Sequence, residues 1–484
     1  MPYGLTDIEL QKLLDVFAQN KRIDQVILYG SRAKGNFKPF SDVDITLVGS
    51  DLSRDDLNKV IQEIDDLLFP YQFDVSLKHK LKNEALIDHI ERRGIEIYKK
   101  ESMRECKLRD IAKYITSGGT PKSSEASYYD GEIPWLNTKE INFNRVYKTE
   151  RFITEAGLQN SSAKWIPKNS VIVAMYGATA GRVAYSLIDL TTNQACCNIV
   201  VNDKYADSLY IFFYLQNSYT ELVNLACGAA QQNLNINVIS NFPILLPSLE
   251  EQKRISSILS SLDDKMDLLY RENKTLETMA ETLFRKWFIE DIKEDWKEGT
   301  LDDILSVKGG ATPSTKESKY WDGNISWTSP KDITTLNGIY LFDTERKITQ
   351  EGLNQISSGL LPAGTLLMSS RAPVGVLAYA EVPLAINQGY IAIIDDKGYA
   401  KEFIYLWLKV NMDMVHSYAN GSTFMEISKS AFKSLSLQIP PKHIVDDFCN
   451  RIKPIFEKIK INELQIRTID KTKDNILPKL MSNE

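Results

Sequence analysis

The chain has 484 residues, of which 43% are hydrophobic and 25% charged, so it is long enough for about three ordinary domains. Lysine and arginine number 58 against 64 acidic residues, and the formal charge of -6 excludes the strongly basic composition of a simple nucleic-acid-binding protein. Five cysteines without a CxxC pair favour neither disulfides nor a zinc ribbon, so we expect a reducing, cytoplasmic compartment. No apolar run approaches the roughly 18 residues of a membrane span.

The first 100 residues combine an apolar run, a Gly-Ser pair and closely spaced acidic residues. The run IDQVILYG predicts a strand that ends at Gly30-Ser31, where a helix begins, and SDVDITLV and FDVSL predict two further strands. Asp42 and Asp44 are two residues apart and so share a face of the first of these strands, while Asp74 lies on the second strand. Three carboxylates converging at strand edges suit hard divalent cations that hold a triphosphate.

This pattern resembles the minimal nucleotidyltransferase family, whose motif is GS, about ten residues, and then DxD, as in polymerase beta-like domains. The resemblance implies that Asp42, Asp44 and Asp74 are catalytic and bind Mg²⁺, with a nucleoside triphosphate as the second cofactor. A glycine lets the backbone approach a phosphate, and the following serine can donate to one. The alternative is a solvated acidic loop or an inactive relic. The residues expected to bind the nucleotide are Gly30, Ser31, Arg32 and Lys34.

From Lys107 onward the sequence is duplicated. The segment GGTPKSSEASYYDGEIPWLNTKEI, residues 118–141, reappears as GGATPSTKESKYWDGNISWTSPKDI, residues 309–333. The match continues to the end of both copies, so it is a duplication of a whole domain. Further matching pairs are Trp135 with Trp327, Thr149-Glu150-Arg151 with Thr344-Glu345-Arg346, Asn193-Gln194 with Asn387-Gln388, and Pro247 with Pro440.

Each copy ends in a long amphipathic segment. Apolar residues step by three and four through residues 255–287 and again through 448–480, interrupted by Asn273 and Asn462. This is the heptad seam of a coiled coil, in which buried polar residues fix the register. About 33 residues at about 1.5 Å each form a rod of roughly 50 Å. Such rods are longer than a small domain needs, so we expect them to pair; the alternative is that each packs on its own domain.

The duplicated part resembles the specificity subunit of type I restriction-modification systems, with two target-recognition halves. The segments that carry the resemblance are KLRDIAKYITSGGTPKS, IPWLNTKEI, GATAGRVAYS and LPSLEEQKRISSILSSLDDKMD. The resemblance implies a non-catalytic subunit that reads a bipartite double-stranded DNA site and docks two methyltransferase subunits, with nuclease subunits as further partners. The sequence contains no GxxxxGK[ST], [DN]PP[FY] or HExxH motif, which agrees with catalysis supplied by partners.

We therefore predict an α+β multidomain chain. A small α/β nucleotidyltransferase domain occupies residues 1–100, and two mixed α/β target-recognition domains occupy 107–248 and 299–440. Helices over 249–290 and 441–484 form an antiparallel coiled coil, in which Pro454 and Pro478 should kink or bound the second helix.

Candidate DNA-reading residues are polar side chains near the repeated motifs. Amides pair with adenine, and lysine or arginine pairs with guanine or phosphate. Polar residues that recur in both copies equally fit a structural role, and we favour turn hydrogen bonding for the Asn-Gln pairs and core packing for Trp135 and Trp327. The candidates are Thr120, Lys122, Ser123, Lys139, Arg182, Asn193 and Gln194 in the first copy, and Lys331, Arg371, Asn387 and Gln388 in the second.

Three functions fit the sequence. The first is a nucleotidyltransferase domain fused to a DNA specificity subunit that acts mainly in sequence recognition. The second is an antitoxin-like nucleotidyltransferase that modifies a partner protein and uses the repeats as a DNA or protein anchor. The third is a scaffold in which both activities are lost. A co-purifying methyltransferase would favour the first function, and a small helical toxin-like partner the second.

Overall fold

The computed structural model describes residues 2–20, 22–38, 40–100, 103–227, 233–292, 296–371, 373–394, 397–420 and 425–482. The chain divides into two compact units, Met1–Ser256 and Ser257–Glu484. Within the described ranges, no helix is both long enough and apolar enough to cross a membrane.

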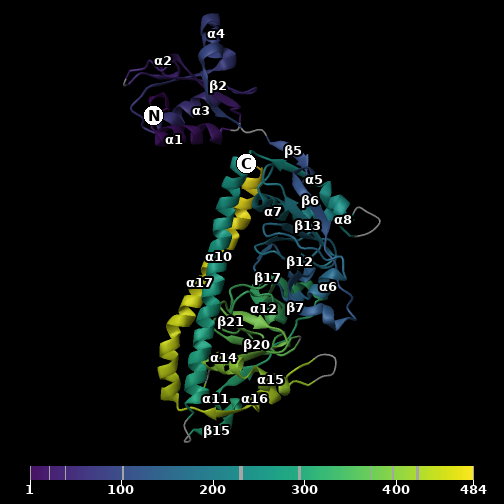
Figure 1. Ribbon diagram of the computed structural model, residues 1–484. Helices are drawn as coiled ribbons and strands as arrows, with labels where there is room; N and C mark the ends of the chain where they lie inside the picture. The colour runs from purple at the N-terminus through teal and green to yellow at the C-terminus, as the bar shows by residue number, and fades with distance from the viewer. Residues whose placement is uncertain are drawn as a thin grey trace. The chain divides into compact units, whose positions relative to one another are not determined.

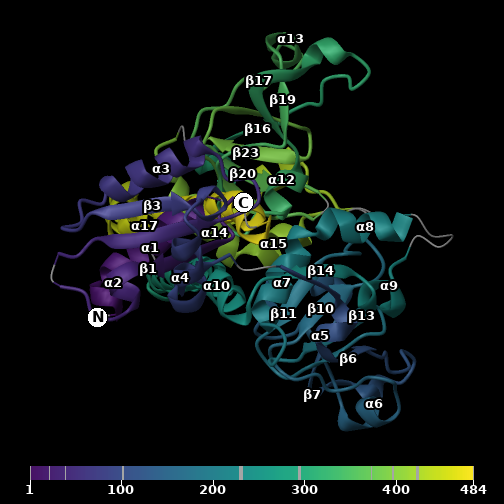
Figure 2. The same ribbon diagram turned by 90° about the horizontal axis from the view of Figure 1, so that it is seen from above.

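The N-terminal domain is built on a four-stranded sheet with the order β3-β2-β1-β4. Strand β1 (Gln25–Tyr29) runs antiparallel to both β2 (Val43–Val48) and β4 (Ile95–Lys99), whereas β2 and β3 (Phe73–Leu77) are parallel. The sheet is therefore mixed, and the beginnings of β2 and β3 lie at the same edge as the end of β1. The domain is drawn in purple and blue in Figures 1 and 2.

The described residues of this domain also form α-helices α1 to α4. Helices α1 (Asp7–Gln19) and α3 (Arg54–Asp65) contribute apolar side chains such as Phe17 to the core that the sheet forms. Both begin with a capping box, in which the N-cap hydroxyl and the acidic residue three positions later satisfy each other's backbone N–H. Helix α2 (Gly30–Ala33) follows β1 directly, and α4 (Glu84–Arg93) precedes β4.

The first recognition half contains a five-stranded sheet, order β6-β13-β10-β11-β8, and a three-stranded sheet, order β12-β7-β9. Both sheets mix parallel and antiparallel pairs. The elements are β5 (Arg104–Lys107), α5 (Leu108–Ile111), β6 (Ala112–Ser117), β7 (Tyr129–Leu136), β8 (Asn144–Val146), β9 (Arg151–Ile153), α6 (Glu155–Gln159), β10 (Val171–Ala174), β11 (Val183–Ser186), β12 (Thr191–Thr192), β13 (Cys196–Val201), α7 (Ser208–Asn217), α8 (Tyr219–Cys227), α9 (Ile236–Ser240) and β14 (Pro243–Leu246).

The second recognition half repeats this topology. Its five-stranded sheet has the order β16-β23-β20-β21-β18 and its three-stranded sheet β19-β17-β22, so each strand has a counterpart in the first half. The predicted duplication and the mixed α+β class are confirmed. The elements are β15 (Lys297–Thr300), α11 (Leu301–Ile304), β16 (Ser306–Lys308), β17 (Trp321–Thr328), α12 (Pro330–Thr334), β18 (Tyr340–Leu341), β19 (Arg346–Ile348), α13 (Gln350–Leu353), β20 (Leu366–Ser369), β21 (Leu377–Ala380), β22 (Leu384–Ile386), β23 (Tyr390–Ile394), α14 (Lys401–Val410), α15 (Met412–Ser417), α16 (Lys429–Lys433) and β24 (Ser436–Ile439).

Two long helices, α10 (Leu249–Arg285) and α17 (Lys442–Ser482), lie side by side (Figure 1). Asp263 pairs with Lys473 and Asn273 with Asn462, so residue numbers rise along one helix as they fall along the other. The helices are therefore antiparallel and pair with each other, as the heptad spacing predicted.

Pro454 and Pro478 were predicted to kink or bound the second helix, and they do not bound it. Helix α17 continues through both Pro454 and Pro478. Both prolines are exposed, whereas Ile452 and Leu477 beside them are buried. A proline removes one backbone hydrogen bond, and packing of the buried face keeps the helix continuous despite this loss.

Candidate nucleotide site and nucleic-acid interface

The acidic residues predicted in the N-terminal domain lie where β1 ends and β2 and β3 begin. Asp44 and Asp74 are paired positions in the register of these parallel strands, and neighbouring strands are about 4.8 Å apart. Gly30, directly after β1, has a φ of 74°, and a Cβ at this position would collide with Oδ2 of Asp44. Only glycine therefore fits between the end of β1 and the Asp44 carboxylate.

Arg32 was predicted to bind the nucleotide, and the structure corrects this. The side chain of Arg32 instead holds the loop that carries Asp42. The side chain is only 2% exposed. Its Nη2 and Nε donate to the carbonyl of Ser41 at 2.7 and 3.0 Å, Nε also donates to the carbonyl of Asp42 at 3.2 Å, and Nη1 donates to that of Tyr3 at 2.9 Å. The guanidinium also lies 4.4 Å from the centre of the Tyr71 ring. Arg32 is thus a positioning residue for Asp42, which is exposed and precedes β2 by one residue.

The electrostatics of this sheet edge favour a cation. Burial, together with the charges of Asp74 and Asp42, raises the pKa of the Asp44 carboxyl above its ordinary value. In the described part of the chain, no three acidic, histidine or cysteine side chains are grouped closely enough to hold a metal ion by themselves. Mg²⁺ is commonly held by one or two protein carboxylates and completes its shell with water and nucleotide phosphates. The neighbouring Asp44 and Asp74 fit that requirement.

The other two nucleotide-site candidates lie in and after the short helix that follows β1. Ser31 is half-buried in α2, and Lys34 is exposed directly after this helix. Their contact with a nucleotide stays a prediction.

In the recognition halves, the repeated asparagines support turns. Oδ1 of Asn193 accepts from the backbone N–H of Ala195 at 3.0 Å, and Oδ1 of Asn387 accepts from that of Gly389 at 2.8 Å. The same turn is therefore built in both copies, because an asparagine side chain readily bonds the backbone two residues on. This geometry favours the structural interpretation over base reading for both residues.

The glutamines that follow these asparagines are also engaged in equivalent ways. Oγ1 of Thr120 donates to Oε1 of Gln194, and Oγ1 of Thr312 donates to Oε1 of Gln388, the latter at 2.7 Å. All four side chains are exposed or half-buried at the end of their turns. The repeated Thr-Gln contact ties the Gly-Gly segment of each copy to its Asn-Gln turn.

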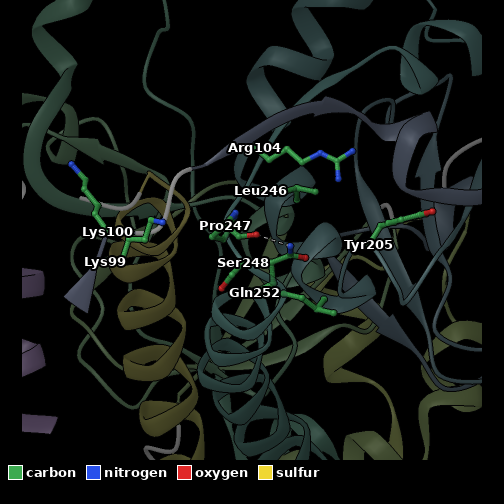
Figure 3. Close-up of a pocket in the computed structure, with 9 residues that line it drawn as sticks. Lys99, Lys100, Arg104, Tyr205, Leu246, Pro247, Ser248 and Gln252 are labelled. Atoms are coloured by element: carbon green, nitrogen blue, oxygen red, sulfur yellow. Dashed lines mark hydrogen bonds between the residues drawn. The ribbon is translucent and has the colours of Figure 1, made fainter. Parts of the chain in front are cut away.

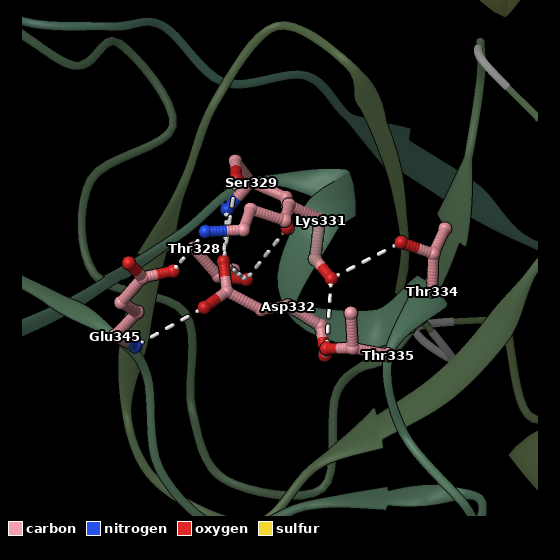
Figure 4. Close-up of polar contacts among 7 residues, drawn as sticks. All are labelled: Thr328, Ser329, Lys331, Asp332, Thr334, Thr335 and Glu345. Atoms are coloured by element: carbon pink, nitrogen blue, oxygen red, sulfur yellow. Dashed lines mark hydrogen bonds and ion pairs between the residues drawn. The ribbon is translucent and has the colours of Figure 1, made fainter. Parts of the chain in front are cut away.

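Two of the candidate lysines form equivalent ion pairs. Nζ of Lys139 lies 2.5 Å from Oε2 of Glu150, and Nζ of Lys331 lies 2.8 Å from Oε2 of Glu345. Figure 4 shows the second pair, next to Asp332, whose Oδ1 accepts from the backbone N–H of Glu345 at 3.1 Å. The hydrogen bond with Glu345 and its charge raise the pKa of Lys331. These contacts account for the recurrence of both lysines without any base reading.

The repeated tryptophans are core residues, as the structural interpretation predicted. Trp135 is 3% and Trp327 is 4% exposed, and each indole Nε1 donates to a backbone carbonyl of its own half, at 2.9 and 3.2 Å. Arg151 and Arg346 lie 5.8 and 5.5 Å from the centres of the respective rings. The repeated Thr-Glu-Arg triplet had no predicted role. In each copy its glutamate pairs with the candidate lysine, and its arginine packs on the repeated tryptophan.

Family models match three parts of the chain. Residues 100–278 and 293–470 each match the family model of the type I restriction modification DNA specificity domain. The chain belongs to the type I restriction-modification specificity family. Residues 11–103 match the family model of polymerase beta nucleotidyltransferases.

Several type I specificity subunits are similar over most of their length. The MjaIX specificity subunit of Methanocaldococcus jannaschii is 27% identical over 410 residues, which cover 78% of this chain and 92% of the relative. The HindI specificity subunit of Haemophilus influenzae is 20% identical over 463 residues, covering 79% and 99% of the two chains. A crystal structure of the S subunit from M. genitalium, 16% identical, covers 80% of this chain and 98% of its own, with a TM-score of 0.49.

Arg182 is a candidate DNA-reading residue whose polar atoms are only partly engaged in hydrogen bonds within the fold. Its Nη1 donates to Oδ1 of Asn142 at 2.7 Å, but its buried Nε has no hydrogen-bond partner among the described residues. The loop before it contains Gly177 and Gly181, whose φ values of 82° and 81° suit only glycine readily. The equivalent position in the second half is Val376.

The remaining candidates give less information. Nζ of Lys122 lies 3.8 Å from Oε1 of Glu125, and Ser123 is exposed. Arg371 is half-buried, and its backbone forms an isolated bridge with Glu426. Their DNA-binding roles stay predictions.

A cavity of about 540 Å³ lies where β5 and α10 begin, and none of the predicted site residues lines it (Figure 3). Its basic lining residues are Lys99, Lys100 and Arg104. Gln252, also in its wall, is fixed by two hydrogen bonds: Nε2 donates to the carbonyl of Pro247 at 2.9 Å, and Oε1 accepts from a backbone N–H, also at 2.9 Å. The wall of the cavity is thus part of the connection between the N-terminal domain, the first recognition half and α10.

Proposed function

We propose that this specificity subunit reads a bipartite, asymmetric site in double-stranded DNA, with one part of the site contacted by each recognition half. The support is that the two halves share one strand order but differ in their loops. Arg182 corresponds to Val376, and Asn137-Thr138 to Ser329-Pro330. Equivalent frameworks that present different side chains recognise different base sequences.

We also propose that the helix pair separates the two parts of the DNA site. Helices α10 and α17 have 37 and 41 residues, which at 1.5 Å per residue gives rods of about 55 to 60 Å. One turn of duplex DNA measures about 34 Å, so rods of this length suit half-sites separated by an unread spacer. Two methyltransferase subunits dock on this framework and supply catalysis, and nuclease subunits join as further partners.

The charge of the chain gives a test of this division of labour. At a formal charge of -6 the isolated chain neutralises few phosphates. We expect weak DNA binding at physiological salt by the chain alone and tight, specific binding once the methyltransferase subunits are present. Fluorescence anisotropy with and without these subunits measures the difference. Nanomolar sequence-specific binding by the chain alone contradicts the proposal.

We further propose that the N-terminal domain is a Mg²⁺-dependent nucleotidyltransferase. The observation that carries this proposal is the register pairing of Asp44 with Asp74 beside the glycine at the end of β1. Asp44 and Asp74, with Asp42 as the third carboxylate of the predicted set, would hold Mg²⁺, which when bound neutralises the triphosphate and activates the attacking oxygen. Arg32 keeps Asp42 in place at this edge by donating to the backbone carbonyl of Asp42. Ser31 and Lys34 would contact the phosphates.

Carboxamide variants test this activity. Asp42→Asn and Asp44→Asn should abolish Mg²⁺-dependent transfer of a labelled nucleotide while assembly and DNA methylation continue, because the functions lie in separate domains. Asp51→Asn is the control, since Asp51 is an exposed acid in the turn beyond the other end of β2. Loss of methylation in Asp42→Asn contradicts this separation. A wild-type chain that neither binds nor transfers any nucleotide with Mg²⁺ or Mn²⁺ contradicts the activity.

A further inference from the structure

The loop between α2 and β2 presents an aromatic ring to solvent beside the proposed nucleotide site. Phe40 is 74% exposed, and its φ is 71°. Phe37, in the same loop, behaves differently: its ring is half-buried and its centre lies 5.5 Å from the guanidinium carbon of Arg32. One loop therefore packs one phenylalanine against the fold and leaves the next in water.

Both properties of Phe40 are unfavourable for the isolated domain. An exposed phenylalanine gains little from the hydrophobic effect, and a left-handed backbone is strained for a bulky residue, for which glycine would be better. Strained residues persist where the surroundings fix them, and they concentrate at ligand sites. The conformation of Phe40 is thus an observation that its role in the fold alone does not explain.

The surroundings do fix this turn. The backbone N–H of Ser41 donates to the carbonyl of Lys38 at 3.0 Å, and the N–H of Lys38 donates to Oγ of Ser41 at 2.9 Å. From the buried side, Nη2 of Arg32 donates to the carbonyl of Ser41 at 2.7 Å. Ser41, directly after Phe40, is therefore held by hydrogen bonds to Lys38 and Arg32.

Phe40 lies two residues before Asp42, so their Cα atoms are at most about 7 Å apart. Lys34 and Lys38 in the same loop are exposed and cationic. An exposed aromatic ring with exposed cations in the same loop is a combination that can bind a base by stacking and phosphates by charge. We propose that Phe40 is a stacking platform for a nucleobase, that of the nucleoside triphosphate or of the end nucleotide of a single-stranded acceptor. This inference rests on the proposed nucleotidyltransferase function.

The test compares full-length variants that change the ring, the strain or both. Phe40→Gly removes the ring and relieves the backbone, whereas Phe40→Trp keeps an aromatic surface. The matched control is Leu68→Gly, because Leu68 is 88% exposed with a φ of 53° and is aliphatic. Calorimetric titration with Mg²⁺ uses three probes: ATP, tripolyphosphate, which has no base, and a short single-stranded oligonucleotide. Differential scanning calorimetry reports the melting temperature of each variant.

We expect Phe40→Gly to weaken ATP binding about tenfold, the scale of one base–aromatic stack. Tripolyphosphate binding should be unchanged, Phe40→Trp should bind ATP as the wild type does, and Leu68→Gly should leave all affinities unchanged. The melting temperature of Phe40→Gly should not fall, because glycine accepts a positive φ. If only oligonucleotide binding weakens, the stacked base is that of the acceptor.

Three results overturn the inference. The first is unchanged binding of both ATP and oligonucleotide by Phe40→Gly. The second is an equal loss of ATP and tripolyphosphate binding, or the same loss in Leu68→Gly, either of which would show a general loosening of the sheet edge. The third is a lower melting temperature, which would show that the ring supports the fold. If one of these results is found and the wild type still binds tripolyphosphate, the nucleotidyltransferase proposal stands and only the role of Phe40 is contradicted. A wild type that binds none of the three probes contradicts both the nucleotidyltransferase proposal and the role of Phe40.

Discussion

Nδ2 of Asn462 donates a hydrogen bond to Oδ1 of Asn273 at 2.8 Å, inside the mainly apolar seam between α10 and α17. The two side chains are 0% and 5% exposed. In any other register each amide would face aliphatic side chains without a partner, which costs free energy. The pair therefore selects the antiparallel register in which the two helices meet.

Leucine at both positions should stabilise the helix pair and weaken its register. A single Asn273→Leu leaves the amide of Asn462 buried without this partner, so we expect a loss of about 1–3 kcal/mol in the free energy of unfolding. The double variant with Asn462→Leu should unfold at a higher urea concentration than the wild type. Spin labels at the exposed positions Lys265 and Lys471 should then give a broadened distance distribution. An unbroadened distribution would show that the apolar residues alone fix the register.

The buried ion pair of the same seam should respond differently to single and double replacement. Nζ of Lys473 lies 2.6 Å from Oδ1 of Asp263, and their side chains are 6% and 9% exposed. Lys473→Met removes this cation from beside a buried carboxylate and should cost about 3–5 kcal/mol, whereas Asp263→Leu with Lys473→Met should be close to neutral. Lys458→Met, which removes an exposed partner of Glu272, should cost less than about 1 kcal/mol. Additive costs in urea unfolding would contradict coupling between Asp263 and Lys473.

Glu463 should make the stability of the second unit depend on pH. This α17 carboxylate is 8% exposed and accepts from the backbone N–H groups of Ile339 and Tyr340 at 2.9 and 3.1 Å. Burial raises its pKa to about 7, although the two N–H donors lower it. Between the ordinary pKa near 4.5 and 7, the folded state keeps a proton that the unfolded state releases. Stability is therefore lost as pH rises through this window, by about 3 kcal/mol in total.

Urea unfolding across this pH range measures the effect directly. Glu463→Gln should remove this part of the slope, while Glu457→Gln, an exposed change on the same helix, should keep it. Identical pH slopes for the wild type and Glu463→Gln would show that Glu463 does not titrate in this window.

The helix pair could be predicted from the sequence to a large extent, because heptad spacing is a local pattern that records one buried face. The pairing of Lys473 with Asp263 could not be predicted, since it depends on the register between two helices far apart in sequence. That the helix would continue through Pro454 and Pro478 could not be predicted, because the sequence does not show how packing along the buried face offsets the lost backbone hydrogen bonds.

The candidate sites show the same limit. The GS and DxD spacing, together with the predicted strand FDVSL, was sufficient to place Gly30, Asp44 and Asp74 at one sheet edge. The spacing did not reveal that Arg32 turns inward to the carbonyl of Ser41, because that contact exists only once the loop has folded. Similarly, the recurrence of Lys139 was visible, but its ion pair with Glu150 required the tertiary structure.

Arg182 should act on one half of the DNA site alone. Its side chain is half-buried, its Nε is buried, and its Nη1 donates to Oδ1 of Asn142, so we expect the outer N–H groups of the guanidinium to contact a base edge. Arg182→Ala should relax one position of one half-site by about 1–3 kcal/mol of discrimination. Lys331→Ala should change no recognised base, because that lysine is engaged with Glu345. Methylation assays on substituted duplexes measure both. Uniform weakening across all sequences would assign Arg182 to phosphate instead.

The most direct test of the account is methylome sequencing of cells that carry the chain with its methyltransferase, before and after shortening the helix pair. The register of Asp263 with Lys473 and of Asn273 with Asn462 places residues 266–272 opposite about 464–470, so both segments are deleted together. For the wild type we predict an asymmetric bipartite site with an unread spacer. The deletion removes roughly 10 Å of rod and should shorten the spacer by about three base pairs, or abolish activity, without changing the half-site bases. A continuous or palindromic site, or half-site bases that change with the deletion, would contradict the proposal that the helix pair sets the spacing of a bipartite site.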